Sequence, residues 1–204
     1  MTMATAHIGR ALPRKEGREK VTGAARYVDD LSFPGMIYGA TVRSPAARGR
    51  ITAIRYGDGI PWKEFTIVTA KDIPGKNHVE LILRDQPYLA DGVVNHPEEP
   101  VVLLAHPDKY LLEEARRAVR IEIEPLPAVF TLEESLAKKH IVWGEDNILK
   151  KYVMEKGDVA QAFQRDDITI VKGEYRTGAQ EQLYIETNGM IAQAVAGEIG
   201  RAHV

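Results

Sequence analysis

The sequence contains no cysteine among its 204 residues. Without thiols, the chain has no disulfide, no thiolate zinc site, no cysteine nucleophile and no cysteine-ligated iron–sulfur cluster. A lack of cysteine is compatible with a reducing compartment, so we expect a cytoplasmic location. If this chain takes part in electron transfer, another chain has to carry the electrons onward.

Long apolar runs and an excess of one charge are also missing. No run approaches the roughly 20 apolar residues that a membrane span needs, and the amino-terminal segment lacks the apolar core of a secretory signal. The 27 Lys and Arg residues nearly balance the 29 Asp and Glu residues, so the chain has no strong field that would attract polyanions. We therefore expect neither nucleic acid nor a membrane as a partner.

Several motifs of catalysis and cofactor binding are absent as well. The sequence has no glycine-rich phosphate loop, no Gly-x-Ser-x-Gly elbow and no dinucleotide fingerprint. Its six histidines show neither i, i+4 pairing nor close spacing, and we expect no direct metal ligand in this chain. Flavin or nicotinamide binding by this chain is therefore unsupported.

The first half of the chain has the pattern of a small α+β domain. Residues 1–17 are polar and predict an extended arm. Short runs rich in strand formers follow at residues 36–42, around Ile51 and Ala53, and within EFTIVTAKDIPG, each near a Gly or Pro turn signal, and they predict antiparallel strands. Residues 100–127 then predict a strand, a helix with Asp108 as its N-cap, and a second strand.

The second half has fewer signals of packed structure. Residues 129–150 are charged and lack a continuous apolar pattern, which predicts an ordered linker. A short helix is predicted at 159–163, followed by a strand through Ile168, Ile170 and Val171 toward Tyr175. This region has too little apolar material to close its own core, so we interpret residues 151–197 as the start of a domain.

Four segments together carry a resemblance to a known family. They are EKVTGAARYVDDLSFPGMIYGATVRSPAARGRI, YLADGVVNHPEEPVVLLAHPDKYLLEEARRAVRIEIEPLPAV, KGDVAQAFQRDDITIVKGEYRTG and QEQLYIETNGMIA. Their order resembles that of the molybdopterin-binding large subunit of the xanthine dehydrogenase and aldehyde oxidase family. The resemblance implies an α/β hammerhead domain at residues 18–128, followed by the truncated start of the molybdopterin-binding domain. Since members of the family continue several times further, it also implies that this chain is an N-terminal fragment.

The same resemblance implies the chemistry of the intact protein. Members are molybdenum hydroxylases, oxidoreductases that hydroxylate a carbon of a small heterocycle or aldehyde with oxygen derived from water. Molybdenum-molybdopterin would be the cofactor of the intact protein, with iron–sulfur clusters and FAD on partner subunits. The family's general base, a late glutamate, is expected beyond Val204, so the fragment should contain no catalytic residue, hold no cofactor tightly and be inactive. The alternative is a non-catalytic hammerhead-like module that docks a partner subunit.

The resemblance assigns one cofactor-binding residue and suggests a second. Gln180 matches the glutamine of the family's Gly-x-Gln turn, whose neutral amide hydrogen-bonds an oxygen ligand of the molybdenum. Glu186 matches the glutamate of the following strand. Each has a structural alternative: Gln180 could cap a strand or turn, and Glu186 could pair with a buried backbone group or an arginine.

Two positions depart from the family pattern. Many relatives have histidine two residues after the glutamine, whereas this chain has Gln182, which removes a group that titrates near neutral pH. Relatives often have a glycine-glutamine pair where this chain has Glu98-Glu99, in the stretch HPEEPV. The two carboxylates could mark a different subgroup or substrate, or they could belong to a solvated loop.

The last seven residues, EIGRAHV, have a second interpretation. They are the translation of GAG ATC GGA AGA GCA CAC GTC, which matches the start of a common sequencing-library adapter. On this hypothesis residues 198–204 are an artefact, the true sequence is lost at about Gly197 or Glu198, and the chain is a fragment of a longer gene. The alternative is a natural tail with the same sequence.

Overall fold

The computed structural model describes residues 11–79, 83–181, 183, 189–193 and 201–203, the last three by their backbone alone. The chain divides into two compact units, one of Gly35–Ile170 and one that combines Met1–Pro34 with Val171–Val204. Each unit is described here by itself. Among the described residues, none of the helices has both the length and the apolar composition that crossing a bilayer would need.

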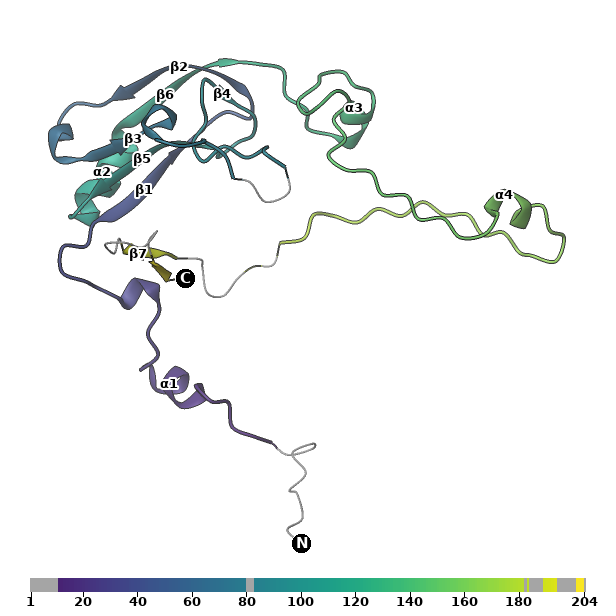
Figure 1. Cartoon of the computed structure of the whole chain (residues 1–204), viewed down its shortest axis with the longest axis horizontal. Helices are drawn as coiled ribbons and strands as arrows, with labels where there is room; N and C mark the ends of the chain where they lie inside the picture. Colours follow the sequence, from purple (N-terminus) through teal and green to yellow (C-terminus); the bar gives the residue numbers. More distant parts are fainter. Residues whose placement is uncertain (1–10, 80–82, 182, 184–188, 194–200, 204) are drawn as a thin grey trace, which may run out of the picture. The chain divides into compact units, whose positions relative to one another are not determined.

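The first unit is built on two three-stranded antiparallel sheets (Figure 1). In one, β5 (Pro100–His106) is the central strand between β1 (Tyr38–Arg43) and β3 (Thr66–Val68). In the other, β2 (Gly49–Tyr56) lies between β4 (Val93–Val94) and β6 (Val119–Pro125). Short 3-10 helices at Trp62–Glu64 and Ala70–Asp72 flank β3. The predicted antiparallel strands are thus confirmed, with small shifts at their ends.

Strand β5 forms the middle of the hydrophobic core. Val101, Val102 and Leu104 are fully or almost fully buried, because the strand has a neighbour on each side and apolar residues on both of its faces. Its partners in the core are mostly aliphatic residues from β1, β4, α2 and β6; the core cluster consists of Val42, Phe65, Ala90, Val94, Val101, Val102, Leu104, Leu112, Ala115 and Val119. This apolar run therefore holds the unit together.

Helix α2 (Lys109–Ala118) begins where the sequence predicts it. The Asp108 carboxylate accepts hydrogen bonds from the backbone N–H groups of Tyr110 and Leu111, at 2.8 and 3.2 Å, and so caps the first turn. Leu112 and Ala115 are buried on the face that contacts β1 and β5. The opposite face is charged, as the amphipathic pattern indicates.

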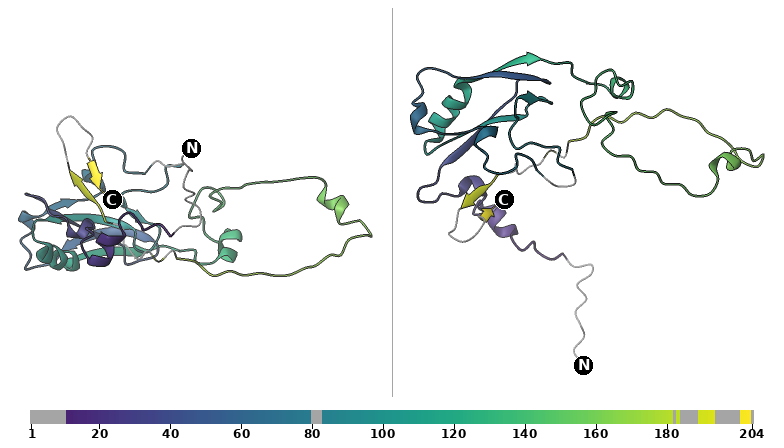
Figure 2. Two further views of the ribbon diagram at one scale, coloured as in Figure 1. Left: turned by 90° about the horizontal axis from the view of Figure 1, so that it is seen from below. Right: turned by 45° about the horizontal axis from the view of Figure 1, so that its top comes forward.

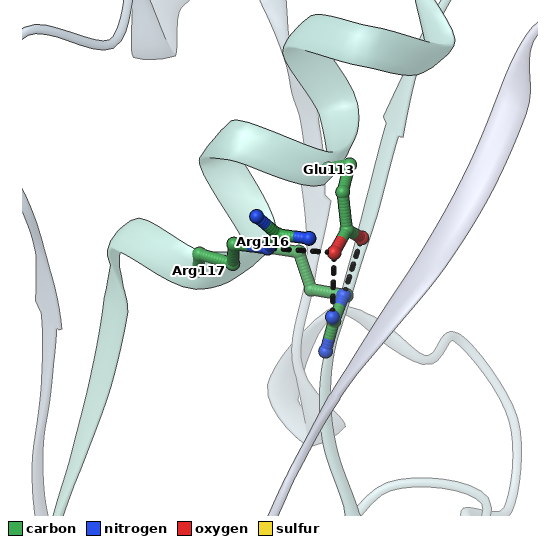
Figure 3. Close-up of polar contacts among 3 residues, drawn as sticks. All are labelled: Glu113, Arg116 and Arg117. Atoms are coloured by element: carbon green, nitrogen blue, oxygen red, sulfur yellow. Dashed lines mark hydrogen bonds and ion pairs between the residues drawn. The ribbon is translucent and has the colours of Figure 1, made fainter.

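On the charged face of α2, Glu113 holds two arginines (Figure 3). Its carboxylate accepts two hydrogen bonds of 2.7 Å from Arg116 and one of 2.9 Å from Arg117. The two hydrogen bonds from Arg116, together with the one from Arg117, lower the pKa of Glu113 to about 2. The group is exposed to solvent, so its contribution to stability is reduced by screening.

The strands β2 and β6 approach each other closely at Gly49. A Cβ atom at this position would lie 2.2 Å from Cγ2 of Ile123 and 2.7 Å from the carbonyl oxygen of Glu124, so only glycine fits. Further along the pair, Arg55 and Glu122 form an exposed salt bridge with a 2.8 Å contact. At the exit of β6, the Arg48 side chain donates to the carbonyl of Pro127 at 2.8 Å, which fixes the start of the linker.

The linker is ordered locally around one side chain. Helix α3 (Leu132–Leu136) is capped by Thr131, whose hydroxyl accepts from the N–H of Glu134. The amide of Asn147 accepts from the N–H groups of Val142 and Trp143 and donates to the carbonyls of Ser135 and His140. These hydrogen bonds order the chain locally between Thr131 and Asn147, and the linker at 129–150 stays a prediction.

Beyond the linker, the described chain has little secondary structure. Helix α4 (Val159–Ala162), capped by Asp158, is a single turn in a run of irregular backbone, as Figures 1 and 2 show. The predicted strand through Ile168, Ile170 and Val171 is wrong for this structure. A strand needs a neighbour for its backbone groups, and residues 164–181 are exposed and have no such neighbour among the described residues.

The second unit contains α1 (Gly17–Thr22), a 3-10 helix at Val28–Asp30, and a hairpin of β7 (Ile191–Gln193) and β8 (Arg201–His203). Helix α1 begins at Gly17, the last residue of the predicted arm at 1–17; residues 1–10 lie outside the described residues, and the arm stays a prediction. Glycine in a left-handed conformation at Gly23 (φ 73°) ends that helix through backbone hydrogen bonds to its last turn. No apolar period marks α1, and none of its residues is buried, which is why the pattern of the sequence does not reveal it.

The central position of β5 leads to a prediction for the two adjacent leucines. Leu104 is fully buried, whereas Leu103 is 37% exposed on the other face of the strand. Replacing Leu104 with Ala should lower the free energy of unfolding by about 2–5 kcal/mol, because it leaves a cavity. The matched change Leu103→Ala should cost roughly 0.5 kcal/mol. Urea unfolding of both variants measures the difference, and equal losses would contradict this assignment of the core.

The lowered pKa of Glu113 leads to a second prediction. Because the pKa is lower in the folded than in the unfolded chain, the ionised carboxylate stabilises the fold above about pH 4.5, and this contribution is lost as the pH falls toward 2. Glu113→Gln should therefore lose less stability than the unchanged protein between about pH 5 and about pH 3. Urea midpoints at the two pH values measure this.

The neighbouring exposed residue provides the control. Glu114→Gln leaves Glu113 and both arginines in place, so its loss of stability on acidification should match that of the unchanged protein. High salt should reduce the contrast between the variants, because exposed ion pairs are screened. An identical pH dependence for Glu113→Gln and Glu114→Gln would show that the pair contributes nothing.

Candidate functional site

Gln180, the principal predicted site residue, lies in an exposed stretch of the second unit. Residues 171–181 have neither helix nor strand, and all of them are exposed. The amide of Gln180 is therefore accessible, but the structure brings no other predicted site residue to it among the residues that it describes. Its predicted role stays a prediction.

The other residues of that segment fall mainly where the structure gives no description. Glu186 and Gln182 lie outside the described residues, so neither the predicted strand position of Glu186 nor the effect of glutamine at 182 is tested. Within the described part of the chain, no three His, Asp or Glu side chains come together in a way that could hold a metal ion.

In the Glu98-Glu99 loop one carboxylate is exposed and the other is buried, and its interpretation as a mark of a different subgroup or substrate stays a hypothesis. Glu98 is exposed and has a left-handed backbone, with φ of 62°. Such a conformation is unfavourable for residues with a Cβ atom and normal for glycine, the residue that the family pattern favours here. Three contacts hold the loop in place: Glu98 N–H donates to the Ser44 carbonyl at 3.0 Å, Ser44 N–H donates to the Glu99 carbonyl at 2.8 Å, and Arg43 donates to the Glu98 carbonyl at 2.8 Å.

Glu99 points inward instead of toward solvent. Only 2% of its surface is exposed, and its Oε2 accepts a hydrogen bond of 2.5 Å from the backbone N–H of Asn95. The loop is thus one exposed and one buried carboxylate on a fixed backbone, and the pair is not a simple solvated loop. The two carboxylates cannot act together, because they face different surroundings.

The exposed carboxylate belongs to the charge pattern around α2. The pKa of Arg116 is raised above its usual value, mainly by its hydrogen bonds to Glu113 and to a smaller degree by the negative charge of Glu98. Glu98 and Glu113 therefore both lie near Arg116. This side of the hammerhead has fixed charges of both signs.

A side-chain clamp that the sequence pattern does not reveal holds the loop before β4. Asn77 donates to the carbonyl of Leu89 at 2.6 Å and accepts from the N–H of the same residue at 3.1 Å. This double contact resembles one step of a β ladder, and a bridge between Val79 and Gln86 continues it. An asparagine in a polar loop is common, so no local signal distinguishes this one.

Two family models match successive stretches of this chain. Residues 22–127 match the family model described as "Aldehyde oxidase and xanthine dehydrogenase, a/b hammerhead domain", which is more than half of the chain. The chain belongs to the aldehyde oxidase and xanthine dehydrogenase family. Residues 143–201 match a second model, "Molybdopterin cofactor-binding domain".

Curated relatives cover most of this chain. A probable xanthine dehydrogenase subunit of Bacillus subtilis is 32% identical over 185 residues, which are 88% of this chain and 24% of the relative. The "Nicotinate dehydrogenase large molybdopterin subunit" of Eubacterium barkeri is 31% identical over 191 residues, which are 91% of this chain and 44% of the relative. The chain thus spans about a quarter of the first relative and somewhat under half of the second.

Solved structures show the same likeness. The quinoline 2-oxidoreductase of Pseudomonas putida 86 is 28% identical, with a TM-score of 0.54, over 61% of this chain and 17% of that one. The α+β hammerhead fold and its place in this family are therefore confirmed.

The described residues do not by themselves fit a molybdopterin cofactor. They offer one matching amide, that of Gln180, in an exposed stretch, and they form no enclosure around it. Two cavities lie on the described part of the chain, one on β2 near Lys71 and Asp91 and one lined by Leu83 and Tyr152. Neither contains Gln180, so no chemical step is assigned to residues of this chain.

The positive φ of Glu98 leads to a prediction that distinguishes the effect of backbone strain on stability from the effect of the carboxylate charge. Glu98→Gly and Glu98→Ala both remove the carboxylate, but only glycine takes a positive φ without steric cost. The glycine variant should therefore be more stable than the alanine variant by about 1 kcal/mol, measured by urea unfolding. A more stable alanine variant would show that Glu98 is not strained in solution.

Proposed function

We propose that this chain is part of the molybdenum-binding subunit of a molybdenum hydroxylase, an oxidoreductase that hydroxylates a carbon of a small heterocycle or aldehyde with oxygen from water. The observation that carries the proposal is the match to two successive family models, the hammerhead domain and the molybdopterin-binding domain, in the order seen along this chain. The cofactor of the intact protein would be molybdenum-molybdopterin, which supplies the redox chemistry when bound.

The names of the relatives favour a nitrogen heterocycle as substrate. Xanthine, nicotinate and quinoline appear in the names of similar proteins, and all three are electron-poor nitrogen-containing rings. An aldehyde is the second possibility, because the aldehyde oxidoreductase of Desulfovibrio gigas shares the fold. A panel of both substrate classes would decide between them.

Electron transfer out of the subunit would require partners. Two relatives are named as subunits, and this chain has no cysteine to ligate an iron–sulfur cluster. We therefore propose an iron–sulfur subunit and an FAD subunit as partners, in the cytoplasm. Neighbouring genes for such subunits would support this assembly.

Gln180 is the residue proposed to contact the cofactor. A neutral amide can donate a hydrogen bond without adding charge to a charged metal centre, and its exposure leaves it free to meet a group supplied by the rest of the assembly. Side chains that orient the ligands of a metal typically affect metal affinity or activity by roughly 10–100-fold.

This role can be tested in the subunit expressed at the full length that its gene encodes, together with its partner subunits. Gln180→Ala should lower kcat by roughly 10–100-fold, because the amide donor is lost. Initial rates with a panel of heterocycles and aldehydes and an artificial electron acceptor measure this, with molybdenum content determined by mass spectrometry. The exposed glutamine Gln164, replaced with Ala, is the matched control and should leave kcat unchanged.

The outcomes of this experiment test the role of Gln180 and the enzyme assignment independently of each other. Unchanged kcat and molybdenum content in Gln180→Ala would overturn the role of Gln180 while leaving the enzyme assignment intact. An assembly that contains no molybdenum and oxidises none of the substrates would overturn the enzyme assignment, and would favour a non-catalytic module that docks a partner subunit.

A further inference from the structure

Four aromatic rings make successive contacts within the hammerhead. The ring centroids of Tyr56 and Trp62 are 5.0 Å apart with planes at 67°, and those of Trp62 and Phe65 are 5.6 Å apart. Phe65 in turn stacks on His106, with centroids 4.5 Å apart. The row connects Tyr56, which is 37% exposed, with His106, of which only 7% is exposed.

Only two of these rings lose an electron readily. Indole and phenol side chains are the easily oxidised aromatic groups of proteins, whereas phenylalanine and histidine resist one-electron oxidation. Trp62 lies partly buried against the core and Tyr56 lies at the surface end of the row. Their edge-to-face contact is therefore a short path for an electron between Trp62 at the core and Tyr56 at the solvent.

Backbone and side-chain hydrogen bonds hold Trp62 beside Tyr56. The indole Nε1–H of Trp62 donates to the carbonyl of Gly57 at 2.8 Å, and Gly57 N–H donates to the carbonyl of Ala118 at 3.0 Å. A Cβ atom at residue 57 would lie 2.9 Å from that same carbonyl oxygen, so the close approach requires glycine. Tyr56 is itself paired with Val119 in the ladder between β2 and β6.

We propose that Trp62 and Tyr56 form a one-electron transfer pair that moves an oxidising equivalent from the edge of the hydrophobic core to the protein surface. The oxidant is a small inorganic radical in solution that takes one electron from an aromatic ring. The azide radical belongs to this class. This inference rests on the geometry of the hammerhead alone and does not depend on the proposed enzymatic function.

The transfer balances in electrons and protons. The oxidant takes one electron from the indole of Trp62, and the resulting radical cation releases its Nε1 proton to water. Tyr56 then gives one electron to the indolyl radical and its phenolic proton to water, while the indole regains a proton from water. The net change is the loss of one electron and one proton by Tyr56, which becomes a tyrosyl radical.

The surroundings of Tyr56 suit this role. Partial burial, with a smaller effect from the negative charge of Asp72, raises the pKa of the phenol above its usual value, so the group is protonated at neutral pH and has a proton to release. The Tyr56 residue is 37% exposed, so solvent reaches part of it. The radical thus forms where small reductants in solution can reach it.

The experiment is pulse radiolysis of the 204-residue chain with azide radicals, which oxidise tryptophan selectively. The visible absorption of the tryptophan radical should decay as the near-ultraviolet absorption of the tyrosyl radical grows. The growth should be first order, with a rate that does not depend on protein concentration. Tyr56→Phe keeps the ring and should lose this fast phase completely.

Two matched variants identify the pair. The chain has two tryptophans, Trp62 and Trp143, and Trp143→Phe should keep the fast phase because Trp62 remains. Tyr110→Phe removes an exposed tyrosine on α2 and should also keep it. Circular dichroism confirms that each variant is folded. A fast phase that persists in Tyr56→Phe, or a rate that scales with protein concentration, would overturn the proposal.

Discussion

The burial of β5 between two neighbouring strands and against helix α2 is the constraint on which the hammerhead depends. A strand of this kind needs a hydrogen-bonded neighbour along each edge and apolar cover above and below. Its neighbours β1 and β3 satisfy the edges, and helix α2 supplies cover through Leu112 and Ala115. Because the capping by Asp108 starts α2 directly after β5, the helix can fold back across β1 and β5. The loop of Glu98 and Glu99 enters the same strand, which is why its backbone is held so firmly.

Much of the hammerhead could be predicted from local patterns. The strand–helix–strand unit from Pro100 to Pro125 was recognisable because the apolar period changes from continuous to helical to alternating within one segment. The strand predicted through Ile168 was wrong because it rested on alternating apolar residues alone. Such alternation shows a tendency to form a strand but does not supply a neighbouring strand to pair with. Helix α1 has no buried residue, so it left no apolar signal to find.

The candidate site could be predicted only in part, and chiefly from resemblance. Nothing in the local composition around Gln180 distinguishes it from other exposed glutamines. The clamps of Asn77 and Asn147 could not be predicted, because their backbone partners are set by the folded path of the loops. The burial of Glu99 could not be predicted either, because two adjacent carboxylates in a loop suggest that both are exposed to solvent. The left-handed backbone of Glu98, which accompanies the inward direction of Glu99, is known only from the structure.

The pairing of strands that are distant in the sequence bears on how the chain folds as it is synthesised. The Thr52 hydroxyl contacts the carbonyl of Glu122 across 70 residues, and Tyr38 pairs with His106 in the other sheet. Each sheet therefore closes a long loop before its contacts stabilise the fold, which makes folding slow and dependent on late segments. On the ribosome, the sheet of β1, β5 and β3 cannot be completed before β5 is synthesised, and the sheet of β4, β2 and β6 cannot be completed before β6 is synthesised. Until α2 and β6 have emerged, the apolar faces of β5 are a natural target for chaperones.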